Sequence, residues 1–143
     1  MKTLIKTTIL FLVLITTSSC FIDSLTGIKG NGDVITESRE IDANFENIKV
    51  QQGINLYLTQ GNSSSISVEA DENIMELLRT EVIGNELKVY LTKNVYRAKA
   101  RNVFLTTENI TKIKTSSGAS VKSENTLQLT ALNLDASSGS SIK

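Results

Sequence analysis

The sequence contains no histidine, no proline and no tryptophan, and it has a single cysteine, Cys20. The missing histidine excludes Ser-His-Asp and Cys-His catalysis, in which an imidazole takes up the proton of the nucleophile. It also excludes imidazole ligands for zinc, and one thiol alone builds neither a cysteine metal site nor an intramolecular disulfide. We therefore expect a protein that is not an enzyme and that binds no metal and no cofactor.

The sequence also lacks an excess of charge of either sign. Its 143 residues include 15 Lys and Arg against 15 Asp and Glu, so the formal net charge is zero. Because nucleic-acid-binding domains usually carry a basic surplus, we expect no nucleic-acid partner. The length suits a single domain.

The N-terminus has the pattern of a secretory signal peptide. Lys2 and Lys6 form a positively charged start, an unbroken apolar run follows at 9–15, and small residues lead up to Cys20. The apolar run is too short to span a bilayer as a permanent helix. We therefore predict that residues 1–19 are a signal peptide.

Cys20 directly follows this segment, within Thr17-Ser18-Ser19-Cys20. These four residues resemble a lipobox, in which the thiol is diacylated and becomes the first residue of the mature chain. An incidental cysteine beside a signal cleavage site is the alternative. We expect lipidation of Cys20, which would make the membrane a partner through the lipid anchor. Phe21 replaces the aspartate of the inner-membrane retention signal, so we predict an outer membrane lipoprotein, either periplasmic or surface-facing.

Residues 20–33 are predicted to be a lipidated tether that ends in a glycine-rich turn. Within it, Asp23-Ser24-Leu25 resembles a short O-glycosylation motif of some Gram-negative envelopes, which would modify Ser24. A plain linker is the alternative, and the three residues alone favour it.

Short runs of alternating apolar residues begin after the tether and predict an all-β fold. Asp71 can cap a short helical turn at 71–78, and Gly84-Asn85 is suited to a tight hairpin turn. The expected strands are 34–36, 48–50, 54–59, 66–70, 80–83, 86–91 and 103–105.

Two segments that lie 21 residues apart, Ile113–Lys122 and Leu134–Lys143, share Ser-Ser-Gly-x-Ser and a final lysine. Such a period is typical of stacked coils, so we expect three-sided coils of about 21 residues. Gly118 and Gly139 would occupy corners where φ is positive. The side chains expected to point inward are Ile113, Thr115, Ala119, Val121, Leu127, Leu129, Leu132 and Leu134.

Stacking of the two coils would place Lys114 beside Asp135 and Val121 beside Ile142. Ile48–Leu56 has the same spacing at an offset of 65, but the helical turn and the hairpin in between break the period. We therefore expect a sheet-rich cap at 34–100 and regular coils at 101–143. The sequence stops in mid-coil at Lys143, so the last coil is expected to be incomplete, with open strand edges that invite self-association.

Four sets of residues carry a family resemblance: Phe45–Val50, Gly53–Gly61 with its Gly-Ile-Asn, Val68–Asn73, and the serine-rich repeats at 116–120 and 137–141. Together they resemble the head GIN domain family, also described as putative autotransporter adhesins, over residues 31–143. The resemblance implies a right-handed β-helix or β-solenoid-like domain at 34–143 in envelope lipoproteins of Gram-negative bacteria, without catalytic residues. Family members usually run through several more coils than this chain.

Arg97, Lys99 and Arg101 alternate with alanines, which on one strand would place three cations on one face. Such a face could contact anionic glycans or the phosphates of lipopolysaccharide, because Arg forks suit these groups. A basic edge strand that discourages aggregation is the alternative.

Three further groups of residues are candidate sites. The serines at 116–117 and 137–138 could contact sugars, but such serines more often satisfy the backbone of turns. Asp71 and Glu72 could pair as glycosidase carboxylates, but Asp71 has a simpler role as a helix cap. The tyrosines Tyr57, Tyr90 and Tyr96 are too scattered in the sequence to predict a sugar-stacking platform.

These features favour a non-enzymatic cell-envelope lipoprotein whose β-solenoid is an adhesive or scaffolding surface. Its partners would be envelope or host glycans, or proteins. Two alternatives stay open: an envelope-stress or signalling module, and a carbohydrate-active β-helix enzyme, for which the segment at 97–101 is the candidate material.

Overall fold

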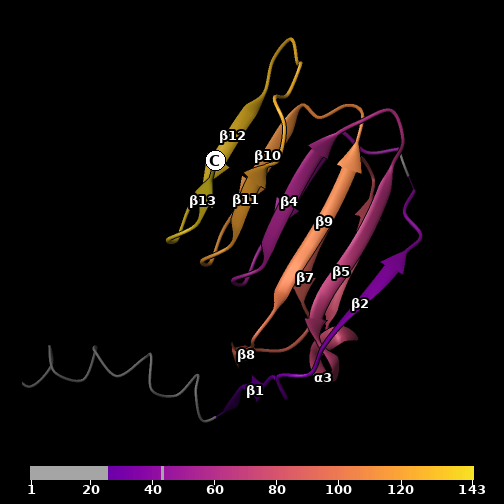
Figure 1. Ribbon diagram of the computed structural model, residues 1–143. Helices are drawn as coiled ribbons and strands as arrows, with labels where there is room; N and C mark the ends of the chain where they lie inside the picture. Colours follow the sequence, from indigo (N-terminus) through magenta and orange to yellow (C-terminus); the bar gives the residue numbers. More distant parts are fainter. Residues whose placement is uncertain (1–25, 43) are drawn as a thin grey trace, which may run out of the picture.

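The computed structural model describes residues 26–42 and 44–143, and the regular structure in them is almost entirely β-strand, as the sequence predicts (Figure 1). The only helix that lies entirely within this described part, α3, is four residues long. The elements in chain order are β1 (Ile28–Lys29), β2 (Val34–Arg39), β3 (Asn47–Val50), β4 (Asn55–Gln60), β5 (Ser65–Asp71), α3 (Glu72–Met75), β6 (Leu78–Ile83), β7 (Glu86–Leu91), β8 (Val95–Arg97), β9 (Arg101–Thr107), β10 (Lys112–Thr115), β11 (Ser120–Ser123), β12 (Asn133–Ala136) and β13 (Ser141–Ile142).

These strands form two main sheets. The six-stranded sheet has the order β13-β11-β4-β9-β5-β2, and its strands lie side by side from left to right in Figure 1. The five-stranded sheet has the order β12-β10-β3-β7-β6, and a separate pair joins β1 to β8. The predicted hairpin is present, because β6 and β7 pair antiparallel around Gly84-Asn85.

Three strand–turn–strand units cross from one sheet to the other and stack in parallel register: β3–β4, β10–β11 and β12–β13. Lys114 lies opposite Asp135, and Val121 lies opposite Ile142, so both predicted pairs are confirmed. The β10–β11 unit lies between the other two: it pairs with β12–β13 on one side and with β3–β4 on the other, where Ile48 lies opposite Ile113. Part of the segment that we expected to be an irregular cap therefore belongs to the regular stack.

The stacking order differs from the chain order. β3 pairs with β7 on the side away from β10, and β4 pairs with β9 on the side away from β11. The chain thus places the β3–β4 unit first, adds β7 and β9 on one side of it, and then returns to add β10–β11 on the other. No constant sequence period can express that order, which explains why the period is clear only in the last two units.

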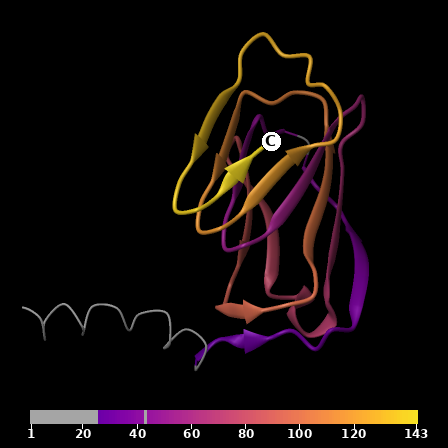
Figure 2. The same cartoon turned by 60° about the vertical axis from the view of Figure 1, so that its left-hand side comes forward.

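The three units turn between sheets through the same backbone conformation, seen as three bends one behind another in Figure 2. Two successive residues have positive φ in each bend: Gln52 and Gly53, Ser117 and Gly118, and Ser138 and Gly139. This is the type I′ pattern, and the N–H of Ala119 donates to the carbonyl of Ser116 across its turn at 3.2 Å. The positive φ predicted for Gly118 and Gly139 is confirmed at +74° and +72°.

The turns are also bonded to one another. The N–H of Gly53 donates to the carbonyl of Ser117 at 2.9 Å, and the N–H of Gly118 donates to the carbonyl of Ser138 at 3.1 Å. At the other end of the row, the side-chain oxygen of Gln52 accepts the N–H of Leu91 at 2.8 Å. The backbone ladders of the sheets thus continue around the bends.

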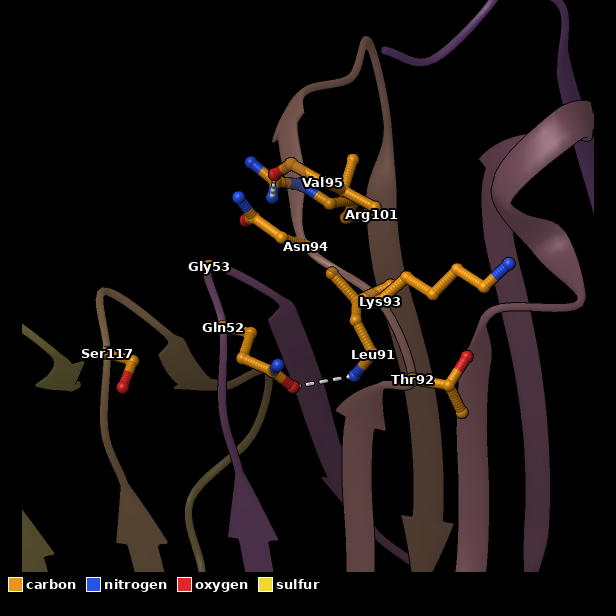
Figure 3. Close-up of a pocket in the computed structure, with 9 residues that line it drawn as sticks. All are labelled: Gln52, Gly53, Leu91, Thr92, Lys93, Asn94, Val95, Arg101 and Ser117. Carbon is orange, nitrogen blue, oxygen red and sulfur yellow. Dashed lines mark hydrogen bonds between the residues drawn. The ribbon is translucent and has the colours of Figure 1, made fainter. Parts of the chain in front are cut away.

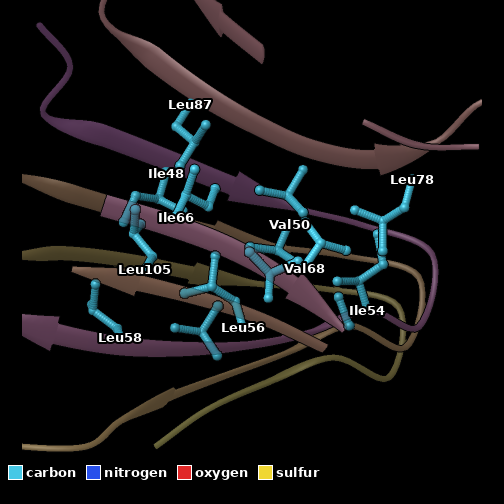
Figure 4. Close-up of a cluster of buried hydrophobic side chains, with 14 of the residues drawn as sticks. Ile48, Val50, Ile54, Leu56, Leu58, Ile66, Val68, Leu78, Leu87 and Leu105 are labelled. Atoms are coloured by element: carbon cyan, nitrogen blue, oxygen red, sulfur yellow. The ribbon is translucent and has the colours of Figure 1, made fainter. Parts of the chain in front are cut away.

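The space between the two sheets is filled by alternate side chains of their strands (Figure 4). Of the residues predicted to point inward, four are buried: Ile113, Thr115, Ala119 and Val121. Leu127, Leu129 and Leu132 are only partly buried. Leu134 is 54% exposed, because no strand of the described part lies beyond β12 to cover it.

The expectation of three-sided coils is wrong, because residues 124–132 form no strand. The connections that follow β4, β9 and β11 differ in length: 61–64, 108–111 and 124–132. Segments of unequal length cannot stay in register over several units, so only two sides of each unit form ladders.

Substitutions in the second bend test the role of its backbone conformation. Gly118→Ala should lower the free energy of unfolding by about 1–2 kcal/mol, because an L-residue is strained at positive φ. No atom outside the chain neighbours of Gly118 lies within 4 Å of the added Cβ, so this backbone strain would be the whole effect. Ser117→Gly, at φ 54°, should be neutral or stabilising by up to about 1 kcal/mol. Urea unfolding measures both, and equal effects of the two substitutions would contradict this account.

Candidate functional site

The three cations predicted to lie on one strand are separated by a bend. β8 ends at Arg97, residues 98–100 leave the strand, and β9 begins at Arg101. The expectation of one straight basic strand is therefore wrong. The bend has a clear cause, because the N–H groups of Lys99 and Ala100 both turn toward the carboxylate of Asp71, at 3.0 and 2.9 Å.

Asp71 is fully buried at the end of β5, and it holds three segments together. Besides Lys99 and Ala100, its carboxylate accepts the N–H of Gly32 at 2.9 Å. A Cβ added to Gly30 would collide with this carboxylate. The predicted helix-capping role is wrong, since Asp71 makes no side-chain hydrogen bond to the start of α3.

The charge of Asp71 is stabilised by backbone dipoles. Burial alone would raise the pKa of this carboxyl, but the N–H donors of Ala100, Lys99 and Gly32 outweigh it and hold the pKa below the ordinary value of 3.8. Such an anion is a structural group and not a proton donor at neutral pH.

The described part of the predicted tether is tied to the domain. β1 pairs in parallel with β8, and the N–H of Asn31 donates to the side-chain oxygen of Asn73 at 2.9 Å. Asn73 in turn donates to the carbonyl of Lys29 at 2.9 Å. Cys20 and Ser24, the predicted lipidation and O-glycosylation sites, lie outside the described residues.

Two of the three predicted cations gather with a third from β1. Lys29 lies opposite Arg97 in the β1–β8 pair, and both line a pocket of about 430 Å³ together with Lys99. Arg97 and Lys99 are exposed. Lys29 was missed as a candidate because its pairing with β8 has no local signal in the sequence.

Arg101 has a different environment. Its guanidinium is half-buried, donates to the carbonyl of Val95 at 3.2 Å and lies beside Gly53. Burial lowers the pKa of this guanidinium, and the charge of Asp71 opposes that shift. Arg101 therefore stabilises the chain around the bend at 98–100, and it does not join Arg97 and Lys99 at the surface.

Arg101 also lines a pocket of about 420 Å³ at the end of the sheets where the bends lie (Figure 3). Gln52, Gly53 and Ser117 contribute from two of the bends, and residues 91–95 complete the wall. Figure 3 shows the Lys93 side chain extending away from Arg101. The two cations of this pocket thus do not converge on a common point.

The outer face of the six-stranded sheet carries a stacked aromatic pair. Tyr57 of β4 and Phe104 of β9 are cross-strand partners, with ring centroids 5.0 Å apart and ring planes at 14°. The ammonium of Lys122 lies 6.0 Å from the centroid of the Tyr57 ring. The stacking of Tyr57 on Phe104 could not be predicted from the sequence, because pairing between β4 and β9 follows no sequence repeat.

The serines of the repeats serve the bends. The carbonyls of Ser117 and Ser138 accept the glycine N–H groups of the neighbouring bends. The hydroxyl of Ser116 accepts a hydrogen bond from the Gln51 side chain at 3.3 Å. A hydroxyl that bonds to the backbone of a bend is that of Ser140, which accepts the N–H of Ser137 at 3.0 Å.

The fold is that of several bacterial proteins of solved structure, most of them described as putative adhesins. A putative adhesin from Parabacteroides merdae ATCC 43184 superposes with a TM-score of 0.70 at 24% identity, over 78% of this chain and 47% of the other. A putative adhesin from Bacteroides fragilis NCTC 9343 gives 0.73 at 21%, over 82% and 55%. A putative lipid binding protein from Parabacteroides distasonis ATCC 8503 gives 0.68 at 19%, over 76% and 48%.

Residues 44–143 match the family described as putative auto-transporter adhesin, head GIN domain. The chain therefore belongs to the head GIN domain family, as the sequence resemblance implies. It spans about half the length of the solved structures that it matches. A comparison with curated proteins gave no match.

In 26–42 and 44–143, no helix is long and apolar enough to cross a bilayer. Within the same ranges, no group of three or more His, Cys, Asp or Glu side chains is placed to hold a metal ion.

Replacing the buried carboxylate tests the junction at Asp71. Asp71→Asn should lower the free energy of unfolding at pH 7 by about 1–3 kcal/mol, because one amide cannot accept all three N–H groups. The folded pKa is lowered, so the carboxylate stabilises the fold above pH 3.8 and loses that contribution as pH falls through the folded pKa.

The difference between wild type and Asp71→Asn should therefore be constant near neutral pH and shrink in acid. Denaturant unfolding at a series of pH values measures it. The exposed Asp33→Asn is the matched control and should change stability by less than about 0.5 kcal/mol. A difference that persists unchanged in strong acid would contradict the assigned role.

Proposed function

We propose that this protein is a non-enzymatic cell-envelope lipoprotein whose domain is an adhesive or scaffolding surface. The observation that carries the proposal is the outer face of the six-stranded sheet, where Tyr57 and Phe104 stack among exposed polar side chains. Aromatic rings displayed beside polar groups are typical of binding surfaces. Membership of an adhesin-like family agrees with a location at the cell envelope.

The stacked units support a finer description of the scaffold. Parallel pairing in constant register over β3–β4, β10–β11 and β12–β13 is the pairing that a β-solenoid uses. We propose a right-handed β-solenoid-like domain on this basis. Such a scaffold would present rows of side chains at regular spacing along its flat faces.

The lipobox-like residues before Cys20 support anchoring in the outer membrane. β1 follows shortly after this cysteine, and the cations Lys29, Arg97 and Lys99 lie around it. In an anchored protein these three side chains would stand near the membrane surface. We propose that Arg97 and Lys99 contact phosphate-bearing glycans or head groups there, while Arg101 keeps its structural role.

Anchoring is tested with Cys20→Ser in the full chain, produced in a Gram-negative host. The wild-type protein should fractionate with the outer membrane and carry acyl chains by mass spectrometry, whereas Cys20→Ser should be released in soluble form. Ser19→Ala is the control and should leave fractionation unchanged. Equal membrane retention of Cys20→Ser would contradict the proposal, and protease treatment of intact cells distinguishes surface display from a periplasmic position.

A second partner surface is the edge formed by β12. This strand pairs only with β10 among the described strands, and Leu134 on it is 54% exposed. An open edge with an exposed leucine is suited to pairing with another strand. We propose that a second copy of the chain adds to this edge.

Sedimentation of the full chain in detergent at increasing concentration tests this pairing. Leu134→Lys should lower the association by at least about tenfold, because it places a charge in the new interface. Ile83→Lys changes a similarly exposed residue on β6, the opposite edge of the same sheet. An effect of Leu134→Lys alone indicates pairing of β12 with β12, and an effect of both indicates pairing of β12 with β6. A strict monomer would contradict the proposal.

A further inference from the structure

We propose that a groove beside Phe104, on the outer face of the six-stranded sheet, binds a chain of neutral sugars. The ring of Phe104 would be the stacking face, and the serine and threonine hydroxyls around it would bond to the sugar. This inference rests on the proposed adhesive function and names the ligand class of one of its surfaces.

One row of side chains across the sheet creates the groove. In strand order it contains Lys122, Tyr57, Phe104, Ser67 and Ser38, each opposite the next. Tyr57 stacks on one side of Phe104, and Lys122 lies over Tyr57. On the other side of Phe104 stand only the two serines. The row thus drops from large to small side chains at Phe104, which is 41% exposed.

The groove that results has a volume of about 670 Å³. Its hydroxyl groups come from Ser38, Ser64, Ser65, Ser67 and Thr106. Within the described ranges, none of these five side chains makes a hydrogen bond or another recorded interaction. Because each hydroxyl can both donate and accept, the groove can bond to sugar hydroxyls in either direction.

In the neighbouring row of the same face, the polar side chains are hydrogen-bonded to one another. Asn55 donates to Asn102 at 3.1 Å, and Asn102 donates to Glu69 at 2.7 Å. These amides are used within the protein, whereas the groove hydroxyls are available to a ligand. The hydroxyl groups of this face that can bond to a ligand are therefore those beside Phe104.

The charges of the lining favour a neutral ligand. Arg39 is the cation of the groove, and its guanidinium donates to the carbonyls of Leu78 and Met75, while its Nε is paired with Glu37. Glu40, the groove's carboxylate, is exposed. With its cation engaged and its carboxylate free, the groove would repel an acidic glycan.

A sugar ring suits both the exposed aromatic ring and the hydroxyl groups of the groove. Its C–H face packs on an aromatic ring, and its hydroxyls bond to the polar groups at the edge. An apolar peptide would leave the five hydroxyls without partners. A protein strand that added to the edge strand β2 would lie beside β2 and not over Phe104, because β5 stands between β2 and β9.

The test uses the full chain in detergent, titrated by calorimetry with cellohexaose, maltohexaose, laminarihexaose and chitohexaose. At least one should bind, and Phe104→Ala should weaken that binding about tenfold. Ser67→Leu fills the groove while Phe104 stays, and it should abolish binding. Tyr96→Ala is the matched control, because Tyr96 is equally exposed at 44% but lies on β8. Urea unfolding shows that each variant is folded.

Adhesion of cells that display the protein separates this inference from the proposed function. Adhesion without binding of any of the four probes, or binding that Phe104→Ala and Ser67→Leu leave unchanged, overturns the inference but not the function. Preference for an acidic hexamer such as oligogalacturonate overturns the neutral-ligand assignment. If the wild-type protein neither mediates adhesion nor binds any of the sugars, both the inference and the proposed adhesive function are overturned.

Discussion

Hydrogen bonding between the bends of three stacked units is the constraint on which the rest of this domain depends. Each bend has two residues at positive φ, and the N–H groups of Gly53 and Gly118 each donate to a carbonyl of the next bend. Because these bonds join the strand ladders of the two sheets, the bends and the strands of the three units share one register. That register in turn places Lys114 against Asp135 and Val121 against Ile142.

The sequence was a good guide wherever neighbouring residues determine the structure. Alternation identified most strands, and Gly118 and Gly139 marked bends that are now seen at positive φ. It failed where distant segments meet. The position of β3–β4 between β7, β9 and β10–β11 depends on chain routing, and the bend at 98–100 depends on Asp71. Neither feature leaves a periodic trace.

The candidate sites follow the same division. Arg97 and Lys99 could be singled out from their spacing, but only pairing of β1 with β8 brings Lys29 to them. The aromatic pair and the groove hydroxyls come from four strands of one sheet and from the connection at 61–64, so no short motif contains them. The molecule thus separates a cationic end near β1 from a neutral groove on its side. Two surfaces of different charge can contact two different partners at once.

The junction at Asp71 has a mechanical consequence. An adhesive protein held by its N-terminus is under tension whenever its partner is pulled away, and the load enters through β1. The short β1–β8 pair would yield first, since few bonds hold it. The pull then reaches Gly32 and the carboxylate of Asp71, which divides it between β5 and the bend before β9. In a protein anchored and loaded in this way, one buried side chain would carry the force into the sheet at a distance from Phe104.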